Sequence, residues 1–210
     1  AHGMAKARVP SHAEWAVLWA EMACAAVTQM DEFNTQNLAN TAWAHAKVGH
    51  AAPALFEEMV GKTVARVGEF KRQELTNMVW AYAKAGHASP PLFKAVAQET
   101  VARVGELNPQ DLANVAFAYA TAGHAAPALF EAVAGETVAQ VGDFTPQGLT
   151  NMAWAYSTAG HAAPPLFEAM AGEAAARVGE FTPQGFANTT CAYATAGHAA
   201  PLLFEAVASE

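Results

Sequence analysis

The chain has 210 residues, a formal net charge of −8 and 53% hydrophobic residues, many of them alanine. This composition supplies ample core material but no apolar run long enough to span a membrane, so we expect no membrane partner. Charge is uneven along the chain. Up to Arg103 ten bases stand against nine acids, net +1, whereas beyond it Arg177 alone stands against ten acids, net −9. The second half would repel a phosphate backbone, and the first half would not.

Residues 1–32 predict a single helix at the start of the chain. Ser11 and Glu14 have the spacing of a capping box and precede the apolar residues Trp15 and Leu18. Since the rest of the chain is built from two-helix units, we interpret this segment as a degenerate N-terminal half-repeat, a capping helix that covers the first whole unit.

Residues 33–210 predict five tandem repeats with a period of 37 residues. Such a period is typical of solenoids, in which each unit buries its apolar face against the next. Four copies are whole and the fifth is truncated, with the boundaries 33–69, 70–106, 107–143, 144–180 and 181–210.

Each copy predicts two helices. In the fourth, Thr145 is a suitable N-cap, Pro146 a suitable first helical residue, and Gly160 a left-handed C-cap; a second helix begins near Pro164 and ends before Gly179. These two helices leave no room for a strand. We therefore predict an all-α fold, an α-solenoid of stacked 37-residue helix-turn-helix repeats.

The predicted core face of the first helix combines small residues with one bulky aromatic. Two positions on this face carry a small side chain in every copy, which lets neighbouring helices approach closely. The bulk is expected from an aromatic place, occupied by Trp43, Trp80, Phe117 and Trp154, with Cys191 in the fifth copy. Cys24 and Cys191 are expected to be buried free thiols.

A histidine follows the glycine that ends each first helix, at His50, His87, His124, His161 and His198. Neighbouring copies are about 8 to 10 Å apart, too far for two imidazoles to share a zinc ion. We interpret the histidine as a joint that satisfies carbonyls at the helix end. No recurrent nucleophile or carboxylate accompanies it, so we expect no catalytic residue, no enzyme activity, no metal and no cofactor.

Amide side chains recur on the opposite, polar face of the first helix. Stacking would align them into two rows, formed by Gln36, Gln73, Gln110, Gln147 and Gln184 and by Asn40, Asn77, Asn114, Asn151 and Asn188. One interpretation is a hydrogen-bond ladder between repeats that fixes the stacking. The other is a row of amides offered to nucleobases.

Neighbouring places vary between copies, as they would in a protein that reads one nucleotide per repeat or at exposed sites free to drift. These places are Asn37, Glu74, Asp111, Gly148 and Gly185; Thr41, Met78, Val115, Met152 and Thr189; and Lys47, Lys84, Thr121, Thr158 and Thr195. The glycines weaken the first interpretation because they offer no side chain. The bases Lys47, Lys71, Arg72 and Lys84 would supply phosphate contacts near Asn40 and Asn77.

The repeated phrase LxNxxWAYAxAGHxxPxLF resembles the octotricopeptide repeats and the related helical repeats of FASTK and RAP-domain proteins of algae and protists. The similarity covers about residues 33 to 210. It implies an organellar protein, in a mitochondrion or chloroplast, that binds single-stranded RNA and acts in transcript stability, processing or translation. The chain departs from such proteins in being acidic and in having no RAP-like terminal domain.

A protein-interaction scaffold is the alternative function. Helical solenoids commonly hold a peptide or a partner helix in their groove, and the acidic residues 104–210 favour this interpretation. The RNA-binding candidates from the sequence are the five asparagines from Asn40 to Asn188, the four bases named above, and the variable residues Asn37, Glu74 and Asp111.

Overall fold

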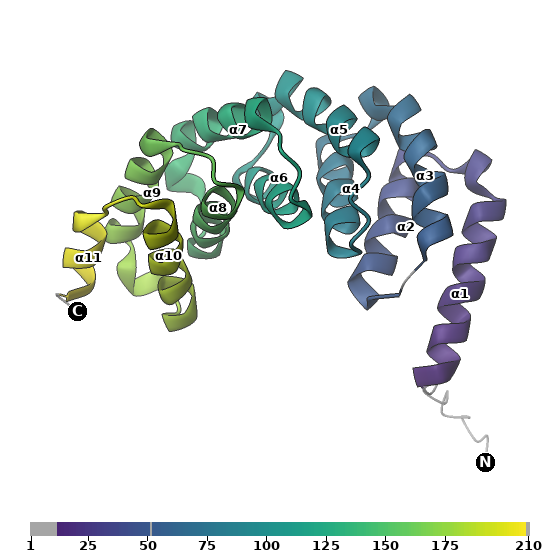
Figure 1. Cartoon of the computed structure of the whole chain (residues 1–210), viewed down its shortest axis with the longest axis horizontal. Coiled ribbons are helices and arrows are strands. Elements are labelled where there is room, and N and C mark those ends of the chain that lie inside the picture. Colours follow the sequence, from purple (N-terminus) through teal and green to yellow (C-terminus); the bar gives the residue numbers. More distant parts are fainter. Residues whose placement is uncertain (1–11, 51, 209–210) are drawn as a thin grey trace, which may run out of the picture.

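A computed structural model describes residues 12–50 and 52–208 of the chain, and these form an arch of paired helices (Figure 1). The first helices of the copies are α2 (Thr35–Val48), α4 (Arg72–Lys84), α6 (Pro109–Ala122), α8 (Pro146–Ala159) and α10 (Pro183–Ala196). The second helices are α3 (Pro53–Ala65), α5 (Pro90–Ala102), α7 (Pro127–Ala139), α9 (Pro164–Ala176) and α11 (Pro201–Ala208). Every regular element of the described residues is helical, which confirms the predicted all-α solenoid.

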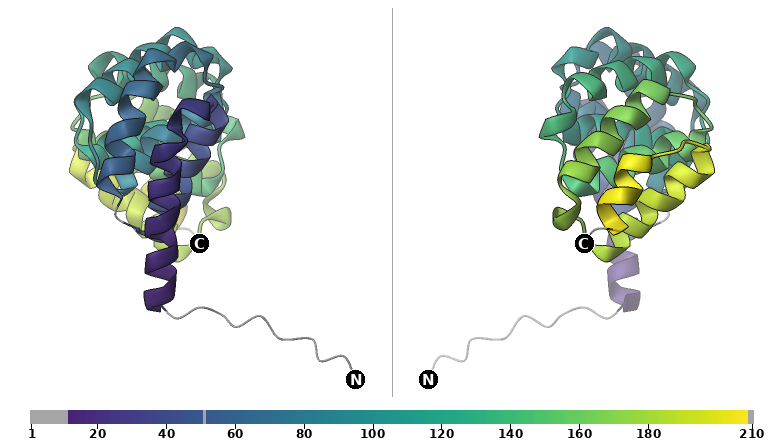
Figure 2. Two further views of the ribbon diagram at one scale, coloured as in Figure 1. Left: turned by 90° about the vertical axis from the view of Figure 1, so that its right-hand side faces the viewer. Right: turned by 90° about the vertical axis from the view of Figure 1, so that its left-hand side faces the viewer.

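The helices form two layers. The first helices line the inner, concave side of the arch and the second helices its outer, convex side (Figure 1). The end views in Figure 2 show the same two layers and show α1 (His12–Thr28) extending past the other helices. Helix α1 packs on α3, as a second helix would, and Ser11 of its expected capping box lies outside the described residues.

Local sequence determines where the first helices begin and end. On α8 the Thr145 hydroxyl accepts the Gly148 amide at 3.1 Å, Pro146 is the first helical residue, and Gly160 has φ 63°. The amide of His161 then donates to the carbonyl of Tyr156 at 3.2 Å, as in a Schellman motif. All of these caps were predicted from the sequence.

The end of each second helix differs from the prediction. After α3, α5, α7 and α9 a separate 3₁₀ helix follows and contains the glycine that was expected to lie in a turn, whereas the 3₁₀ helix after α1 contains no glycine. The five 3₁₀ helices are Met30–Glu32, Val67–Glu69, Val104–Glu106, Val141–Asp143 and Val178–Glu180. A side chain at the helix end, such as Arg103, donates to the carbonyl at the start of its own copy, Phe70, at 2.9 Å. This bond ties the two ends of a repeat together.

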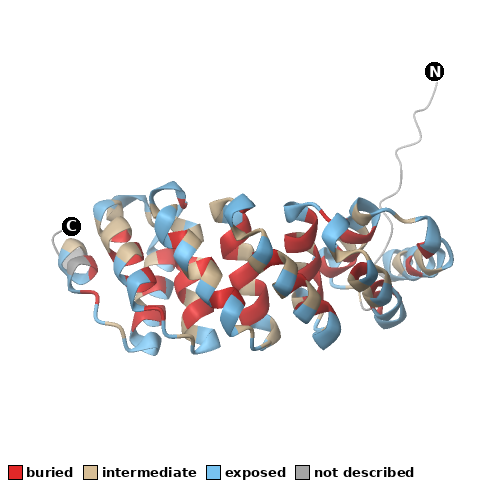
Figure 3. Ribbon diagram, turned by 90° about the horizontal axis from the view of Figure 1, so that it is seen from above, coloured by how far each residue is buried: buried red, intermediate tan, exposed pale blue. Residues whose placement is uncertain are grey.

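Buried segments recur in the helices along the length of the stack (Figure 3). Leucines and tyrosines of the first helices meet leucines and phenylalanines of the second; Leu112, Tyr119 and Phe93 are completely buried. The core is thus one continuous cluster without a boundary between domains.

Tyrosine and histidine together join each repeat to the one before. The hydroxyls of Tyr82, Tyr119, Tyr156 and Tyr193 donate to carbonyls of the preceding repeat at 2.5 to 2.8 Å. The His87 ring stacks on Phe56, also in the preceding repeat, with centroids 4.7 Å apart. The backbone amide of this histidine satisfies a helix-end carbonyl, while its ring packs between repeats.

Candidate nucleic-acid interface

Four places on each first helix face the inside of the arch and form a strip that we call the concave strip. Its members follow one another at intervals of four, three and four residues, so they lie on one side of the helix. They are two amides, then an aromatic, then a lysine or threonine: Gln36, Asn40, Trp43 and Lys47 on α2; Gln73, Asn77, Trp80 and Lys84 on α4; Gln110, Asn114, Phe117 and Thr121 on α6; Gln147, Asn151, Trp154 and Thr158 on α8; and Gln184, Asn188, Cys191 and Thr195 on α10. All are exposed or half-buried.

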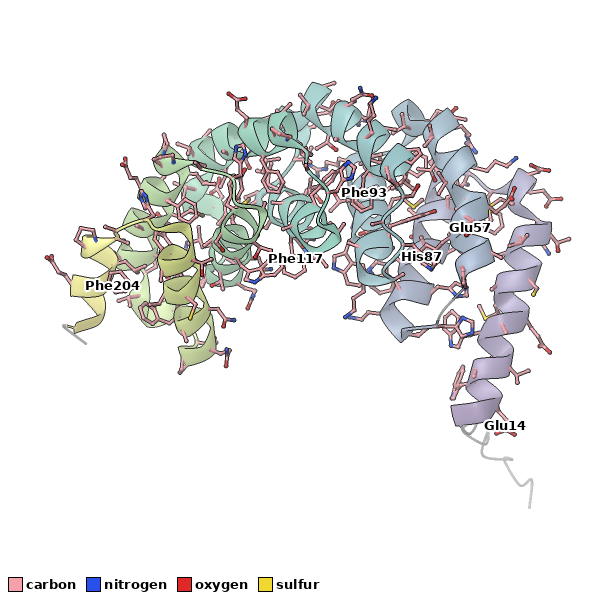
Figure 4. The ribbon with its side chains drawn as sticks, in the orientation of Figure 1. Glu14, Glu57, His87, Phe93, Phe117 and Phe204 are labelled. Atoms are coloured by element: carbon pink, nitrogen blue, oxygen red, sulfur yellow. The ribbon has the colours of Figure 1, made fainter. Side chains whose placement is uncertain are left out.

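The aromatic place lies at the edge of the core and was predicted too deeply buried: Trp80 and Trp154 are half-buried and pack against the core, but none of the four aromatic residues is fully buried. Trp43 is 41% exposed, and Phe117 lies on the inner side of the arch beneath α6 (Figure 4). On α4, α6 and α8 the tyrosine two residues after the aromatic place is the completely buried aromatic residue. Cys191 and Cys24 are both exposed, which corrects their expected burial.

The aromatic rings form two pairs along the strip. The rings of Trp43 and Trp80 have centroids 6.4 Å apart, and those of Phe117 and Trp154 are 4.6 Å apart. The Lys47 ammonium lies 5.9 Å from the Trp43 ring centroid, within cation–π range. A flat ring with an exposed face and a nearby cation can stack a nucleobase and attract its phosphate.

The amide rows do not link the repeats in the described part of the chain. In this part of the chain their side chains form hydrogen bonds only within a helix, where Gln147 donates to Asn151 at 2.8 Å and Gln184 to Asn188 at 3.0 Å. Tyrosine and histidine join the repeats instead. The amides of the concave strip therefore remain available to a ligand.

Two of the three variable candidates are not part of the exposed surface. Glu74 and Asp111 are only 8% and 6% exposed, and the Glu74 carboxylate accepts the Lys71 amide as a helix cap. Burial raises the pKa of Asp111, and the nearby Arg72 opposes this rise. Asn37 is exposed but caps α2 by accepting the Asn34 amide. These three residues serve helix starts, and the structure does not bring Glu74 and Asp111 to the concave side.

The other variable row also lies inside the fold. Four of its members, Met78, Val115, Met152 and Thr189, are at most 2% exposed, and Thr41 is half-buried. Their variation reflects packing between inner helices, so neither drift at exposed sites nor contact with a nucleotide explains it.

Three of the four candidate bases remain free to meet a ligand. Lys47, Lys71 and Lys84 are exposed. Arg72 is committed to the stack, since it donates to the Glu106 carbonyl at 2.6 Å and lies 3.7 Å from Asp111. The cationic part of the concave strip is therefore confined to α2 and α4.

Two other kinds of site receive no support within the described residues. No three histidine, cysteine, aspartate or glutamate side chains in this part of the chain could together hold a metal ion. None of the described helices combines the length and apolar character needed to cross a bilayer.

The aromatic signal could have been read from the sequence. Trp, Trp, Phe and Trp recur three residues after the asparagine and four before the lysine or threonine, which places them beside the polar row on the helical wheel. We assigned them to the core because large aromatics are usually buried.

The chain matches the family model of the RNA-editing substrate-binding complex 6 proteins over residues 12–122 and 60–210. Together these matches span nearly all of the chain, so it belongs to this family. It is an RNA-related helical-repeat protein. No curated protein matches it.

Proposed function

We propose that this chain binds single-stranded RNA along the concave strip and acts in RNA editing or a related step of organellar RNA metabolism. The observation that carries the proposal is the strip itself, in which amides and aromatics repeat on successive inner helices. Aromatic faces stack bases of any sequence, and amide groups bond to base edges. The family name supports an RNA-related role.

The finer parts of this proposal come from the resemblance to octotricopeptide and FASTK repeats. It suggests transcript stability, processing or translation as the process, and a mitochondrion or chloroplast as the location. We further propose that the role is one of binding and not of catalysis, because the strip consists of amides and aromatics without a paired nucleophile and base.

The number of free positive charges on and beside the strip determines the expected strength of RNA binding. With Arg72 committed to the stack, Lys47, Lys71 and Lys84 would neutralise about three phosphates, so log affinity against log salt should have a slope of about −2 for a single strand. We expect weak binding by this chain alone, with contacts concentrated on α2 and α4.

Titration of a labelled single-stranded RNA pool tests the proposal. Trp43→Ala combined with Trp80→Ala should weaken binding by tenfold or more, since each stacked base contributes about 1 to 3 kcal/mol. Phe204→Ala is the matched control. Phe204 is 43% exposed, close to the 41% of Trp43, but it lies on α11 in the outer layer.

Charge reversal gives a second comparison. Lys47→Glu with Lys84→Glu should reduce binding at low salt, whereas Lys94→Glu on the outer helix α5 should not. Binding that ignores both salt and charge reversal, or no binding at low salt, would favour the scaffold, in which the acidic second half holds a peptide or partner helix.

A further inference from the structure

A pocket of about 460 Å³ opens on the concave side between α6 and α8, in the third and fourth repeats. Its lining includes the four amides of the concave strip on these two helices, Gln110, Asn114, Gln147 and Asn151. Asp143, at the end of the 3₁₀ helix before α8, also lines it. The pocket is thus a hollow in the row of amides.

The pocket exists because two small residues meet at this one interface. Where α6 faces α8, Ala113 stands opposite Gly148, and both belong to the pocket wall. Elsewhere one side is larger: Ala39 is paired with Glu74, Thr76 with Asp111, and Thr150 with Gly185. The four described interfaces between inner helices therefore include one with a small residue on each side.

The next interface shows how a larger residue closes this space. Between α8 and α10 the Thr150 hydroxyl lies 3.0 Å from that of Thr189 and 3.4 Å from the Gly185 carbonyl. Between α4 and α6 the space is taken by Asp111, which Arg72 approaches from the preceding repeat. Ala113 and Gly148 have no side chain large enough to occupy this space, so the gap between them stays open.

The polar groups of the pocket are suited to a flat, neutral ring with donors on its edge. Amide side chains offer both donors and acceptors, whereas a carboxylate such as Asp143 only accepts. Gln147 already donates to Asn151, while the side chains of Gln110 and Asn114 form no hydrogen bond with other described residues. The charge of Asp143 would repel a phosphate and attract an amino group.

We propose that this pocket receives one nucleobase of the RNA bound along the concave strip, and that it prefers guanine to uracil. The inference rests on the proposed function. Guanine carries two adjacent donors, a ring N–H and an amino group, that a carboxylate can accept together, and its acceptors suit the amide NH₂ groups; uracil has a single ring donor. The pocket would fix the register of a strand that the aromatic rings alone would let slide.

Two variants fill the pocket with a residue found at the same position in other repeats. Ala113→Thr introduces the residue found at Thr76 and Thr150. Gly148→Asp introduces the residue of Asp111; its Cβ would approach Phe144 to 3.2 Å, so its folding must be checked by circular dichroism. Ala187→Thr is the matched control, the same change at the same place on α10, where Ala187 is exposed.

The measurement is the affinity of the parent and these variants for an all-uridine RNA 12-mer and for the same strand with one central guanosine. We expect the parent to bind the guanosine strand about tenfold more tightly, as one good bidentate contact would give. Ala113→Thr should lose this preference and keep the affinity for the all-uridine strand. Gly148→Asp should lose the preference too and should bind both strands somewhat more weakly, because its added carboxylate repels phosphate. Ala187→Thr should behave as the parent.

Failure of the pocket and failure of RNA binding give different results. Equal affinities of the parent for the two strands, or a preference that survives Ala113→Thr, would overturn the pocket and leave the proposed function standing. No binding of either strand at low salt would overturn both. If Gly148→Asp does not fold, Ala113→Thr decides the matter alone.

Discussion

At the scale of single residues, the joint between α1 and the first whole repeat differs from the joints that follow. The tyrosine that donates to the preceding repeat in four joints is replaced on α2 by His45. His45 is 2% exposed, lies against Trp19 with ring centroids 5.0 Å apart, and its Nδ1 has no hydrogen-bond partner among the described residues. The first joint therefore contains a buried polar atom without a hydrogen bond to any residue that the structure describes, whereas the tyrosine hydroxyl at the equivalent place in the other four joints is hydrogen-bonded.

We predict that His45→Tyr stabilises the chain. A tyrosine hydroxyl at this place would reach the carbonyl of Trp19 as its counterparts reach those of Phe56 and Phe93, a gain of about 1 kcal/mol. Chemical denaturation near neutral pH measures this, with Tyr119→Phe as the reverse change, expected to lose a similar amount. An unchanged His45→Tyr midpoint would contradict the equivalence of the joints.

The same residue predicts a pH dependence. Burial, and secondarily the nearby His50, lower the pKa of His45 below its ordinary value of 6.5. The folded chain binds this proton less tightly than the unfolded chain, so the contribution of neutral His45 is present above pH 6.5 and is lost as pH falls from there through the folded pKa. Thermal melts from about pH 7.5 to about pH 5.5 should fall more steeply for the parent than for His45→Tyr. Parallel curves would exclude His45 as the cause.

At the scale of elements, a side chain that follows each of the helices α3, α5, α7 and α9 closes its own repeat. Arg103 bonds the Phe70 carbonyl, Glu99 and Glu106 at 2.9 to 3.2 Å, and Arg177 repeats this pattern. The Arg103 guanidinium lowers the pKa of the Glu106 carboxyl. The third repeat has Gln140 instead, which reaches the Leu107 carbonyl at 3.1 Å but is uncharged.

We predict that Gln140→Arg stabilises the third repeat by less than about 1 kcal/mol, because the new ion pairs would be partly exposed. Glu136 and Asp143 already stand where Glu99 and Glu106 stand. Thermal denaturation at low and high salt tests this, since the gain should shrink with salt. Gln140→Leu, which removes the bond to Leu107, should destabilise and serves as the comparison.

The helices could be predicted from the sequence because the residues that start and end them lie within the helix or next to it. Thr145, Pro146 and Gly160 define a helix by themselves, and a period of 37 residues implies that neighbours stack. The burial of Glu74 and Asp111 depends on what the adjacent helix presents, and the bond from Tyr119 to Phe93 joins residues 26 apart. Trp43 was misplaced because it lies at the edge of the apolar face, where packing between helices decides its exposure.

At the scale of the whole molecule, the main contacts between helices of the described residues join neighbouring repeats in the stack. The same substitution should therefore have different effects at the middle and at the end. Helix α7 lies between α5 and α9, whereas α11 makes its main contacts with α9 and with the 3₁₀ helix before α10.

Leu129 and Leu203 occupy equivalent places in their repeats and are 2% and 1% exposed. We predict that Leu129→Ala and Leu203→Ala destabilise different lengths of the stack. Each empties a leucine site at a cost of about 2 to 5 kcal/mol. Leu129→Ala should speed amide hydrogen exchange on both sides of α7, whereas Leu203→Ala should affect α9 and α11 and leave α4 unchanged. Uniform acceleration throughout by Leu203→Ala would mean that the stack unfolds as one unit.

The unequal packing of the two layers has a mechanical consequence. The inner helices contact one another far more extensively than the outer helices do, and the tyrosine hydroxyls bind them to the adjacent outer layer. Bending the arch therefore meets most resistance in the inner layer and is accommodated by a change of spacing in the outer one. The inner layer acts as the neutral surface of a bent beam, so the distance from one aromatic ring to the next stays nearly constant while the curvature of the whole molecule changes.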